Sequence, residues 1–239
     1  MMKTDNMLSH LRVSFARHHP SAFLLAAQLL LLLLYALFDG LHSQRALLAA
    51  VGGLIVLLVV WVVARSPATT WVAWVLAIPA FVLSLLSAVI VDSTLLVWSS
   101  LFEAALYFYA TGSLIAYMMR DYRVTVDELF AAGATFTLLA WGFAYLYTAC
   151  EVWFPGSFVS TIKPERSRTY VELLSLSFTN LTATGLSDIV ALTAPGRVLV
   201  MLEQFTGVGY VAMVVSRLIG LTTSGINKRQ EFTTQDHAD

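Results

Sequence analysis

The chain has 239 residues, of which 58% are hydrophobic and only 12% are charged, and its formal net charge is −1. Soluble domains carry about 25% charged residues, so this charge deficit argues against a soluble globular protein and favours a membrane protein. The near-neutral charge lacks the basic excess that accompanies nucleic-acid binding, and the single cysteine, Cys150, excludes an intrachain disulfide.

Long apolar runs indicate where the chain crosses the membrane. A helix needs about 20 apolar residues to span the hydrocarbon core. Six segments satisfy this requirement in chain order: Ser21–Phe38, Ala46–Ala64, Thr70–Val91, Leu95–Met119, Leu129–Trp153 and Gly196–Leu221. The first run is longer than the apolar core of a signal peptide, which has about 7–15 residues, so we expect it to be a retained helix.

The linker Arg120–Glu128 is the most charged stretch in the interior of the chain and forms a plausible module boundary. Thr125 lies three residues before Glu128, the spacing of a capping box at a helix N-terminus. Alternating the six spans places nine Lys and Arg residues on the side of the N-terminus and five on the other side. The positive-inside rule then predicts that both termini are cytoplasmic, in a multi-pass protein of the inner membrane.

The segment Phe154–Pro195 is too polar to span, but it contains a short apolar stretch, Val171–Leu181, followed by a polar loop. Irregular backbone at membrane depth is tolerated only inside protein or around water. Cation filters are rings of backbone carbonyls, and one chain cannot close such a ring, so the pattern implies a symmetric homo-oligomer. The C-terminal end of a short helix also carries a partial negative charge that favours a cation.

The loop Thr182–Asp188 reads Thr-Ala-Thr-Gly-Leu-Ser-Asp and resembles the Thr-Thr-Val-Gly-Tyr-Gly-Asp signature of the potassium-channel pore family. Arg197–Glu203 and Gly209–Leu221 resemble the second pore helix of small bacterial channel-like proteins, and Val124–Phe158 resembles their outer helix and turret. The resemblance implies an all-α membrane protein with six transmembrane helices and a re-entrant pore helix and filter loop between helices 5 and 6. It also implies a homotetramer that passes a monovalent cation, K⁺ or Na⁺.

The predicted organisation follows from this resemblance. The expected parts are a cytoplasmic N-terminal segment (1–20), a four-helix peripheral bundle (21–123), a pore domain (124–221) and a cytoplasmic tail (222–239). The expected ion pathway consists of Thr182, Ala183, Thr184, Gly185, Leu186, Ser187 and Asp188. The resemblance implies permeant cations at Thr184 and Gly185 and no other metal or cofactor.

The loop departs from the family signature at Ala183, Thr184, Leu186 and Ser187. Ala183 lacks the hydroxyl that would bind the innermost ion, and Leu186 lacks the phenol that would tether the filter. If Ser187 must adopt a positive φ, it carries a steric cost of about 1 kcal/mol that glycine avoids. We therefore expect weak selectivity for K⁺.

Three further residues of the last apolar run have two interpretations each. Glu203 is an acid inside an apolar helix, where acids are costly and often functional, and it either pairs with Arg197 or acts near the filter. Gly207 and Gly209 form either a gating hinge or a site of close helix packing. Asp188, in the polar loop before this run, likewise has two interpretations, a cation-attracting ring or an ordinary turn carboxylate.

The fourth apolar run contains one acid, Glu103, and no Arg or Lys before Arg120. Voltage sensors move several basic charges on such a helix, so we do not expect voltage sensing of the usual kind. Glu103 is interpreted as a buried partner of Tyr107 or a polar anchor, with a ligand or proton site as the alternative.

Motifs of nucleotide-binding, hydrolytic and metalloprotease enzymes are absent from the sequence, so we expect no enzyme activity. The first hypothesis is a homotetrameric cation-channel-like protein whose partners are its own copies and the lipid bilayer. The alternative is a non-conducting membrane scaffold or regulatory subunit that retains the channel fold. A monomeric transporter is less favoured, because the inverted repeat of broken helices is not seen.

Overall fold

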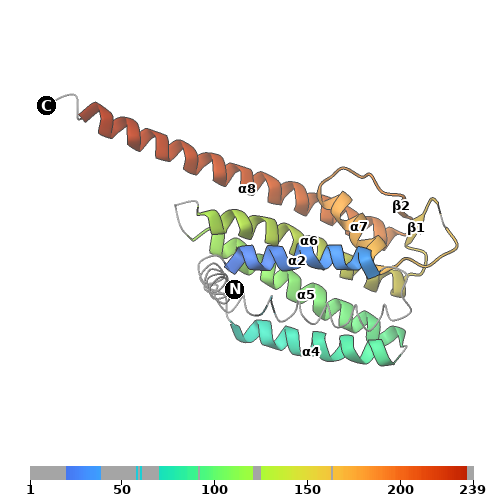
Figure 1. Cartoon of the computed structure of the whole chain (residues 1–239). Helices are drawn as coiled ribbons and strands as arrows, with labels where there is room; N and C mark the ends of the chain where they lie inside the picture. Colours follow the sequence, from blue (N-terminus) through green and yellow to red (C-terminus); the bar gives the residue numbers. More distant parts are fainter. Residues whose placement is uncertain are drawn as a thin grey trace, which may run out of the picture.

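The computed structural model describes residues 20–38, 58, 60, 70–90, 92–120, 125–162 and 164–235. Within these ranges the chain forms six helices and two short strands (Figure 1). The elements are α2 (Pro20–Phe38), α4 (Thr70–Val89), α5 (Ser93–Met118), α6 (Val126–Trp153), β1 (Phe158–Ser160), α7 (Tyr170–Leu181), β2 (Ile189–Ala191) and α8 (Ala194–Gln235). Residues 1–19 of the predicted N-terminal segment and nearly all of the apolar run 46–64 lie outside the described residues, as do the side chains of α8 beyond Arg217.

Polar caps determine where the helices begin. Thr125 caps α6 by accepting a hydrogen bond from the backbone N–H of Glu128 at 3.3 Å. Only this half of the predicted capping box forms, because the Glu128 carboxylate binds Arg217 and does not return to Thr125. A complete capping box is found at α7, where Thr169 and Glu172 each bind the backbone N–H of the other.

Helix α6 lies at the centre of the molecule and packs against α5, α2, α7 and α8. Ser21, near the start of α2, donates to Asp127 near the start of α6 at 3.0 Å. Fourteen residues further along each helix, the rings of Tyr35 and Trp141 are 5.8 Å apart. Helices α2 and α6 therefore run parallel, as expected if both cross a membrane in the same direction.

Helix α8 runs antiparallel to α6. The Tyr210 hydroxyl donates to the carbonyl oxygen of Ala132 at 2.7 Å, and Arg217, further along α8, pairs with Glu128, earlier in α6. These contacts place the N-terminal end of α8 beside the C-terminal end of α6, where α7 and both strands also lie (Figure 1).

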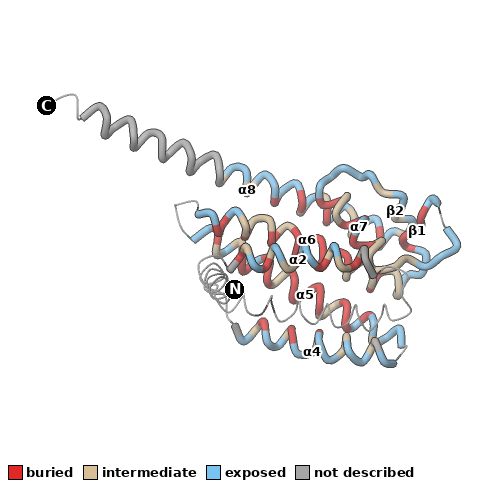
Figure 2. Tube along the Cα trace, in the orientation of Figure 1, coloured by how far each residue is buried: buried red, intermediate tan, exposed pale blue. Residues whose placement is uncertain are grey.

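Two described helices are long and apolar enough to cross a membrane, α6 over Val126–Trp153 and α8 over Ala194–Arg217. Shorter apolar helices occupy Ser21–Tyr35 and Trp71–Ser87. The most apolar part of α6 is 61% buried within the chain, whereas that of α8 is only 17% buried. Figure 2 shows the same contrast in burial between α6 and α8. The apolar surface of α8 is thus available to lipid or to another copy of the chain.

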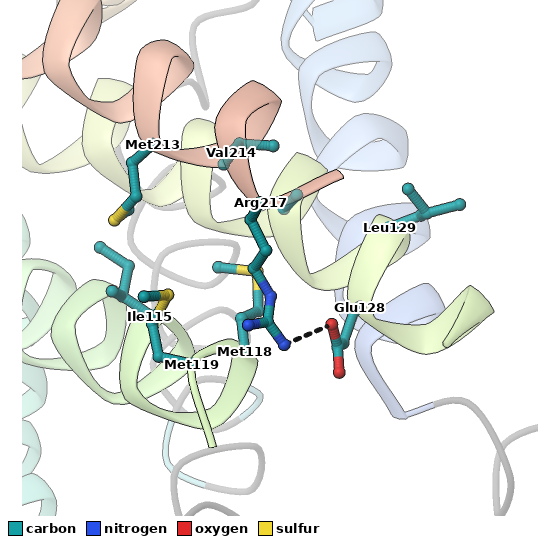
Figure 3. Close-up of a pocket in the computed structure, with 9 residues that line it drawn as sticks. Ile115, Met118, Met119, Glu128, Leu129, Met213, Val214 and Arg217 are labelled. Carbon is teal, nitrogen blue, oxygen red and sulfur yellow. Dashed lines mark hydrogen bonds and ion pairs between the residues drawn. The ribbon is translucent and has the colours of Figure 1, made fainter. Parts of the chain in front are cut away.

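The part of α8 around residues 213–217 meets the end of α5 and the start of α6 around a small cleft (Figure 3). Its lining is mostly apolar and consists of Ile115, Met118, Met119, Glu128, Leu129, Ala132, Met213, Val214 and Arg217. Arg217 Nη2 and Glu128 Oε2 are 3.0 Å apart, and the two side chains are only 16% and 8% exposed. This buried ion pair therefore holds α8 against the start of α6.

We predict that Glu128→Gln lowers the free energy of unfolding by about 1–3 kcal/mol, because a charged hydrogen bond at a buried guanidinium is lost. Thermal unfolding of the purified protein in detergent measures this change. The control is Arg166→Gln, because Arg166 and Glu172 are 3.8 Å apart with 52% and 32% of their side chains exposed. Exposed pairs contribute about 0–1 kcal/mol, so equal losses in both variants would contradict the prediction.

Candidate functional site

Helix α7 is the short apolar helix expected from the sequence, and it packs between α6 and α8 (Figure 1). Its apolar face is buried through Leu173, Leu174, Leu176 and Leu181. The capping box at Thr169 and Glu172 starts the helix, and the loop 182–188 begins directly after Leu181. The position of α7 in the bundle therefore determines where this loop lies.

The first residues of the loop close the C-terminus of α7 in a Schellman motif. The backbone N–H of Ala183 donates to the carbonyl of Asn180 at 2.9 Å, and that of Thr184 donates to the carbonyl of Thr179 at 3.0 Å. Gly185 N–H also reaches Thr179, at 3.2 Å. Ala183 takes the left-handed conformation of the motif, with φ of 56°, at a position that usually holds glycine.

This motif uses the N–H groups of residues 183–185 and leaves the carbonyl oxygens of residues 182–184 available, whereas the Gly185 carbonyl accepts a hydrogen bond from the Ser187 N–H at 3.0 Å. In the described backbone, no hydrogen bond ends on the carbonyls of Thr182, Ala183 or Thr184. Residues 182–186 are exposed in the single chain, and Leu186 is 84% exposed. The loop therefore presents polar acceptors and one large apolar side chain to whatever surrounds this chain.

The threonine side chains of the loop bind the end of α7. Thr182 Oγ1 donates to the carbonyl of Phe178 at 2.8 Å and lies 3.1 Å from Thr184 Oγ1. Thr184 Oγ1 is also 3.2 Å from the carbonyl oxygen of Thr179. Both hydroxyls thus reinforce the turn.

The far end of the loop is attached to the β1–β2 ladder. Ser160 donates to Asp188 Oδ2 at 2.6 Å, and Thr161 N–H donates to the Asp188 carbonyl at 2.8 Å. The expected positive φ does not occur at Ser187, since Ala183 is the non-glycine residue with positive φ in the described backbone. The steric cost considered for Ser187 is instead found at Ala183, because the C-cap of α7 requires a left-handed residue at that position.

Glu203 is fully buried where α8 meets α6 and α7. Its carboxyl group is hydrogen-bonded to the Tyr147 hydroxyl and to the Ser177 hydroxyl. Asn180 extends this network by donating to Tyr147 at 3.2 Å. The pairing with Arg197 considered from the sequence is wrong, since the Arg197 side chain donates to the carbonyl of Ala191 at 3.2 Å.

The two glycines of α8 have different surroundings. A Cβ atom on Gly207 would lie 2.7 Å from the carbonyl carbon of Leu181 and 2.9 Å from its Cα, and closer still to its carbonyl oxygen. A Cβ atom on Gly209 would meet nothing within 4 Å. Gly207 thus packs closely against the end of α7 and Gly209 does not, and a gating hinge at either glycine stays a prediction.

Glu103 is also buried, but it belongs to a different cluster. The carboxyl group interacts with the side chains of Tyr145 on α6 and Ser84 on α4. Tyr107, the partner considered from the sequence, stacks on Tyr145 with ring centroids 5.6 Å apart, and its hydroxyl has no hydrogen-bond partner in the described part of the chain. The expected polar network is therefore two separate networks, one around Glu203 behind the loop and one around Glu103 among α4, α5 and α6.

The sequence interpretation missed four residues that shape this site. Tyr147, Ser177 and Asn180 form the Glu203 network. Glu151 accepts hydrogen bonds from the N–H groups of residues 156 and 158 and orders the turn before β1. The polar residues Ser177 and Asn180, three apart on an apolar helix, were the available signal, because that spacing places them on one face.

We predict that Gly207→Ala destabilises the protein by about 1–3 kcal/mol, the usual cost of overpacking, because backbone of α7 or α8 must move. Gly209→Ala is the matched control on the same helix and should be neutral or slightly stabilising, since alanine is the better helix former. Thermal unfolding in detergent compares the two variants. A loss in Gly209→Ala equal to that in Gly207→Ala would contradict the packing assignment.

We also predict that Ala183→Gly stabilises the protein by about 1 kcal/mol, because the left-handed conformation strains alanine and not glycine. Ser187→Gly serves as the control, since residue 187 does not have a positive φ in the structure and should gain nothing. Chemical or thermal unfolding measures both changes. The prediction fails if Ser187→Gly is the stabilising variant.

A comparison with protein-family models matches residues 133–224 to a family described as "Ion channel". No curated protein and no solved structure matched the chain. The matched segment contains most of α6, all of α7, the loop 182–188 and the described side chains of α8. Over residues 133–224 the chain is therefore similar to an ion-channel domain, consistent with the potassium-channel-like pore family that its loop resembles, and its two long apolar helices support a membrane protein.

Proposed function

We propose that the chain assembles into a homotetrameric channel that conducts monovalent cations, K⁺ or Na⁺, along an axis lined by residues 182–188. The observation that carries this proposal is the pattern of backbone hydrogen bonds in the loop. Its N–H groups close the end of α7, whereas the carbonyls of residues 182–184 receive no hydrogen bond in the described backbone. Carbonyl rings of this kind replace the hydration shell of a permeating cation.

The proposed tetramer accounts for surface that a single chain leaves uncovered. The apolar part of α8 is only 17% buried, and Phe205 and Leu186 are 80% and 84% exposed. A filter loop at membrane depth must be covered by protein or line water. Contact between copies through residues 124–221 would supply that cover, and the number four follows from the potassium-channel resemblance.

In the proposed organisation, residues 21–123 surround the pore domain as a peripheral bundle of four spans. The parallel course of α2 and α6 and the antiparallel course of α8 support six alternating spans with α7 re-entrant. An even number of spans places both termini on the cytoplasmic side of the inner membrane, where the positive-inside rule prefers the basic residues. The buried core is continuous between α5 and α6, across the boundary at residues 123–124.

The proposed selectivity for K⁺ is weak. Thr184 and Gly185 are the proposed cation positions, and Ala183 provides no hydroxyl ligand on the inner side of them. Leu186 is almost fully exposed and has no phenol with which to brace the loop. Small changes per subunit act four times around the axis, and about 1.4 kcal/mol in total changes an ion preference tenfold.

The proposal is tested by purifying the protein and measuring both its assembly and its ion flux. Crosslinking in the native membrane should give a ladder that ends at four chains, and liposomes containing the protein should pass K⁺ and Na⁺. A monomer in the native membrane would contradict the tetramer. A tetramer without flux would contradict conduction and favour the non-conducting scaffold.

We predict that Gly185→Ala abolishes flux, whereas Gly156→Ala leaves it nearly unchanged. Both glycines have positive φ, of 63° and 79°, and an added Cβ atom would meet nothing within 4 Å at either site. The strain of about 1 kcal/mol is therefore similar, and only the location differs, in the loop or in the turn before β1. Equal flux in the two variants would remove residue 185 from the ion pathway.

A further inference from the structure

The carboxyl group of Glu203 is enclosed by side chains that carry no positive charge. It is 0% exposed, and it is hydrogen-bonded to Tyr147 from α6 and to Ser177 and Asn180 from α7. The ion pairs found among the described residues join other groups, Arg166 with Glu172 and Arg217 with Glu128. A buried carboxylate without a cationic partner is very costly, so the stability of this network depends on where its hydrogen atoms lie.

The hydroxyl of Ser177 lies within hydrogen-bonding distance of two oxygen atoms. One is the backbone carbonyl of Ala140 in α6, at 2.8 Å, and the other is Glu203 Oε1. A serine hydroxyl has one hydrogen and two acceptor lone pairs. If Glu203 is ionised, both neighbouring oxygens are acceptors and the one Ser177 hydrogen can bond only one of them, so the Ala140 carbonyl keeps only its bond within helix α6.

A protonated Glu203 lets Ser177 bond both oxygens at once. Asn180 then donates to Tyr147, and Tyr147 donates to Glu203 Oε2. Glu203 donates from Oε1 to Ser177, which in turn donates to the carbonyl of Ala140. In this series of hydrogen bonds each of these donated hydrogens has one acceptor, which is the condition for a stable buried network.

We propose that Glu203 is an uncharged hydrogen-bond donor that fastens α7 to both α6 and α8 and so positions the loop 182–188. The residue acts through Ser177 and Tyr147 and does not touch the proposed ion path. It stands four residues before Gly207, whose missing side chain allows α8 to approach the backbone of Leu181. The two residues together hold the last two turns of α7.

The consequence for ion passage, which rests on the proposed function, is electrostatic. An ionised Glu203 in each subunit would place a ring of fixed negative charges behind the loop, in a region of low dielectric constant. A protonated Glu203 leaves the backbone carbonyls and the end of α7 as the local source of negative potential. Replacing the acid by its uncharged amide should therefore leave ion preference unchanged.

The protonation state is tested first, and without any ion flux, by infrared spectroscopy of the wild type and Glu203→Gln in lipid. The wild-type-minus-variant spectrum should contain the C=O stretching band of a protonated carboxylic acid at neutral pH, with the shift on deuterium exchange expected of an acid. The subtraction removes the signals of the other buried acids, including Glu103. A carboxylate band in its place would overturn the proposal.

The positioning role is tested by thermal unfolding and by the K⁺/Na⁺ reversal potential. Glu203→Gln should retain the wild-type midpoint, since its amide can accept from Tyr147 and donate to Ser177, whereas Glu203→Ala and Ser177→Ala should unfold at lower temperature. Tyr210→Phe is the matched control, because it removes one α8-to-α6 hydrogen bond, at 2.7 Å, away from this network. This control should leave the reversal potential unchanged, whereas Ser177→Ala should shift it.

The outcomes separate this inference from the proposed function. If the wild type passes no ions, the channel proposal fails, while the infrared band and the unfolding series still decide the state and role of Glu203. If Glu203→Gln misfolds, or loses as much stability as Glu203→Ala, the charge is required and the inference is wrong. A shift of the reversal potential in Glu203→Gln would contradict it equally.

Discussion

The backbone groups at the ends of a short helix inside a membrane protein need partners other than water. Helix α7 is fixed in place by its packing between α6 and α8. At one point the contact is backbone against backbone, because Gly207 has no side chain to separate α8 from Leu181. One turn away, Glu203 links α8 to Ser177 and Tyr147. The loop 182–188 begins directly after Leu181. Any movement of the contacts between α7 and α8 would therefore be transmitted to the loop.

The conformation of the loop follows from the rules that end a helix. The N–H groups of residues 183–185 satisfy the last carbonyls of α7, which would otherwise be unpaired at a position away from solvent. The carbonyls that remain available are then those of residues 182–184, since the Gly185 carbonyl accepts from the Ser187 N–H. The same backbone arrangement therefore stabilises the single chain and creates the acceptors that the proposed ion pathway requires. The cost is a strained alanine at 183, with φ of 56°.

The peripheral helices are joined to this core through aromatic side chains. Tyr170, the first residue of α7, lies 4.7 Å from the Tyr145 ring on α6 and 6.2 Å from the Tyr35 ring on α2, measured between centroids. Tyr145 in turn stacks on Tyr107 of α5 and interacts with Glu103. The start of α7 is thus packed against the peripheral helices, and its end is packed against α8. This arrangement gives the outer helices a direct physical connection to the element that carries the loop.

The sequence by itself determined the features that depend on neighbouring residues. Apolar length and polar punctuation predicted α2, α4, α5, α6 and α8 to within a few residues at most described ends, since a run of apolar side chains and its caps are local properties. The residues Val171–Leu181 and the polar loop after them were likewise readable, because a short apolar helix before Thr, Gly and Ser residues is a local pattern. Even the capping of α6 by Thr125 was predicted, although only half of the expected capping box formed.

Tertiary structure decided every feature that depends on which helices meet. Glu128 was expected to close a capping box, but α8 brings Arg217 within 3.0 Å of it, and the ion pair replaces the local bond. Glu203 could be assigned either to Arg197 or to the loop from spacing alone, and only the approach of α6 and α7 supplied Tyr147 and Ser177. Gly207 and Gly209 are two residues apart in the sequence, yet a helix turns by about 200° between them. One therefore faces Leu181 and the other does not, a distinction that exists only once α8 has a neighbour.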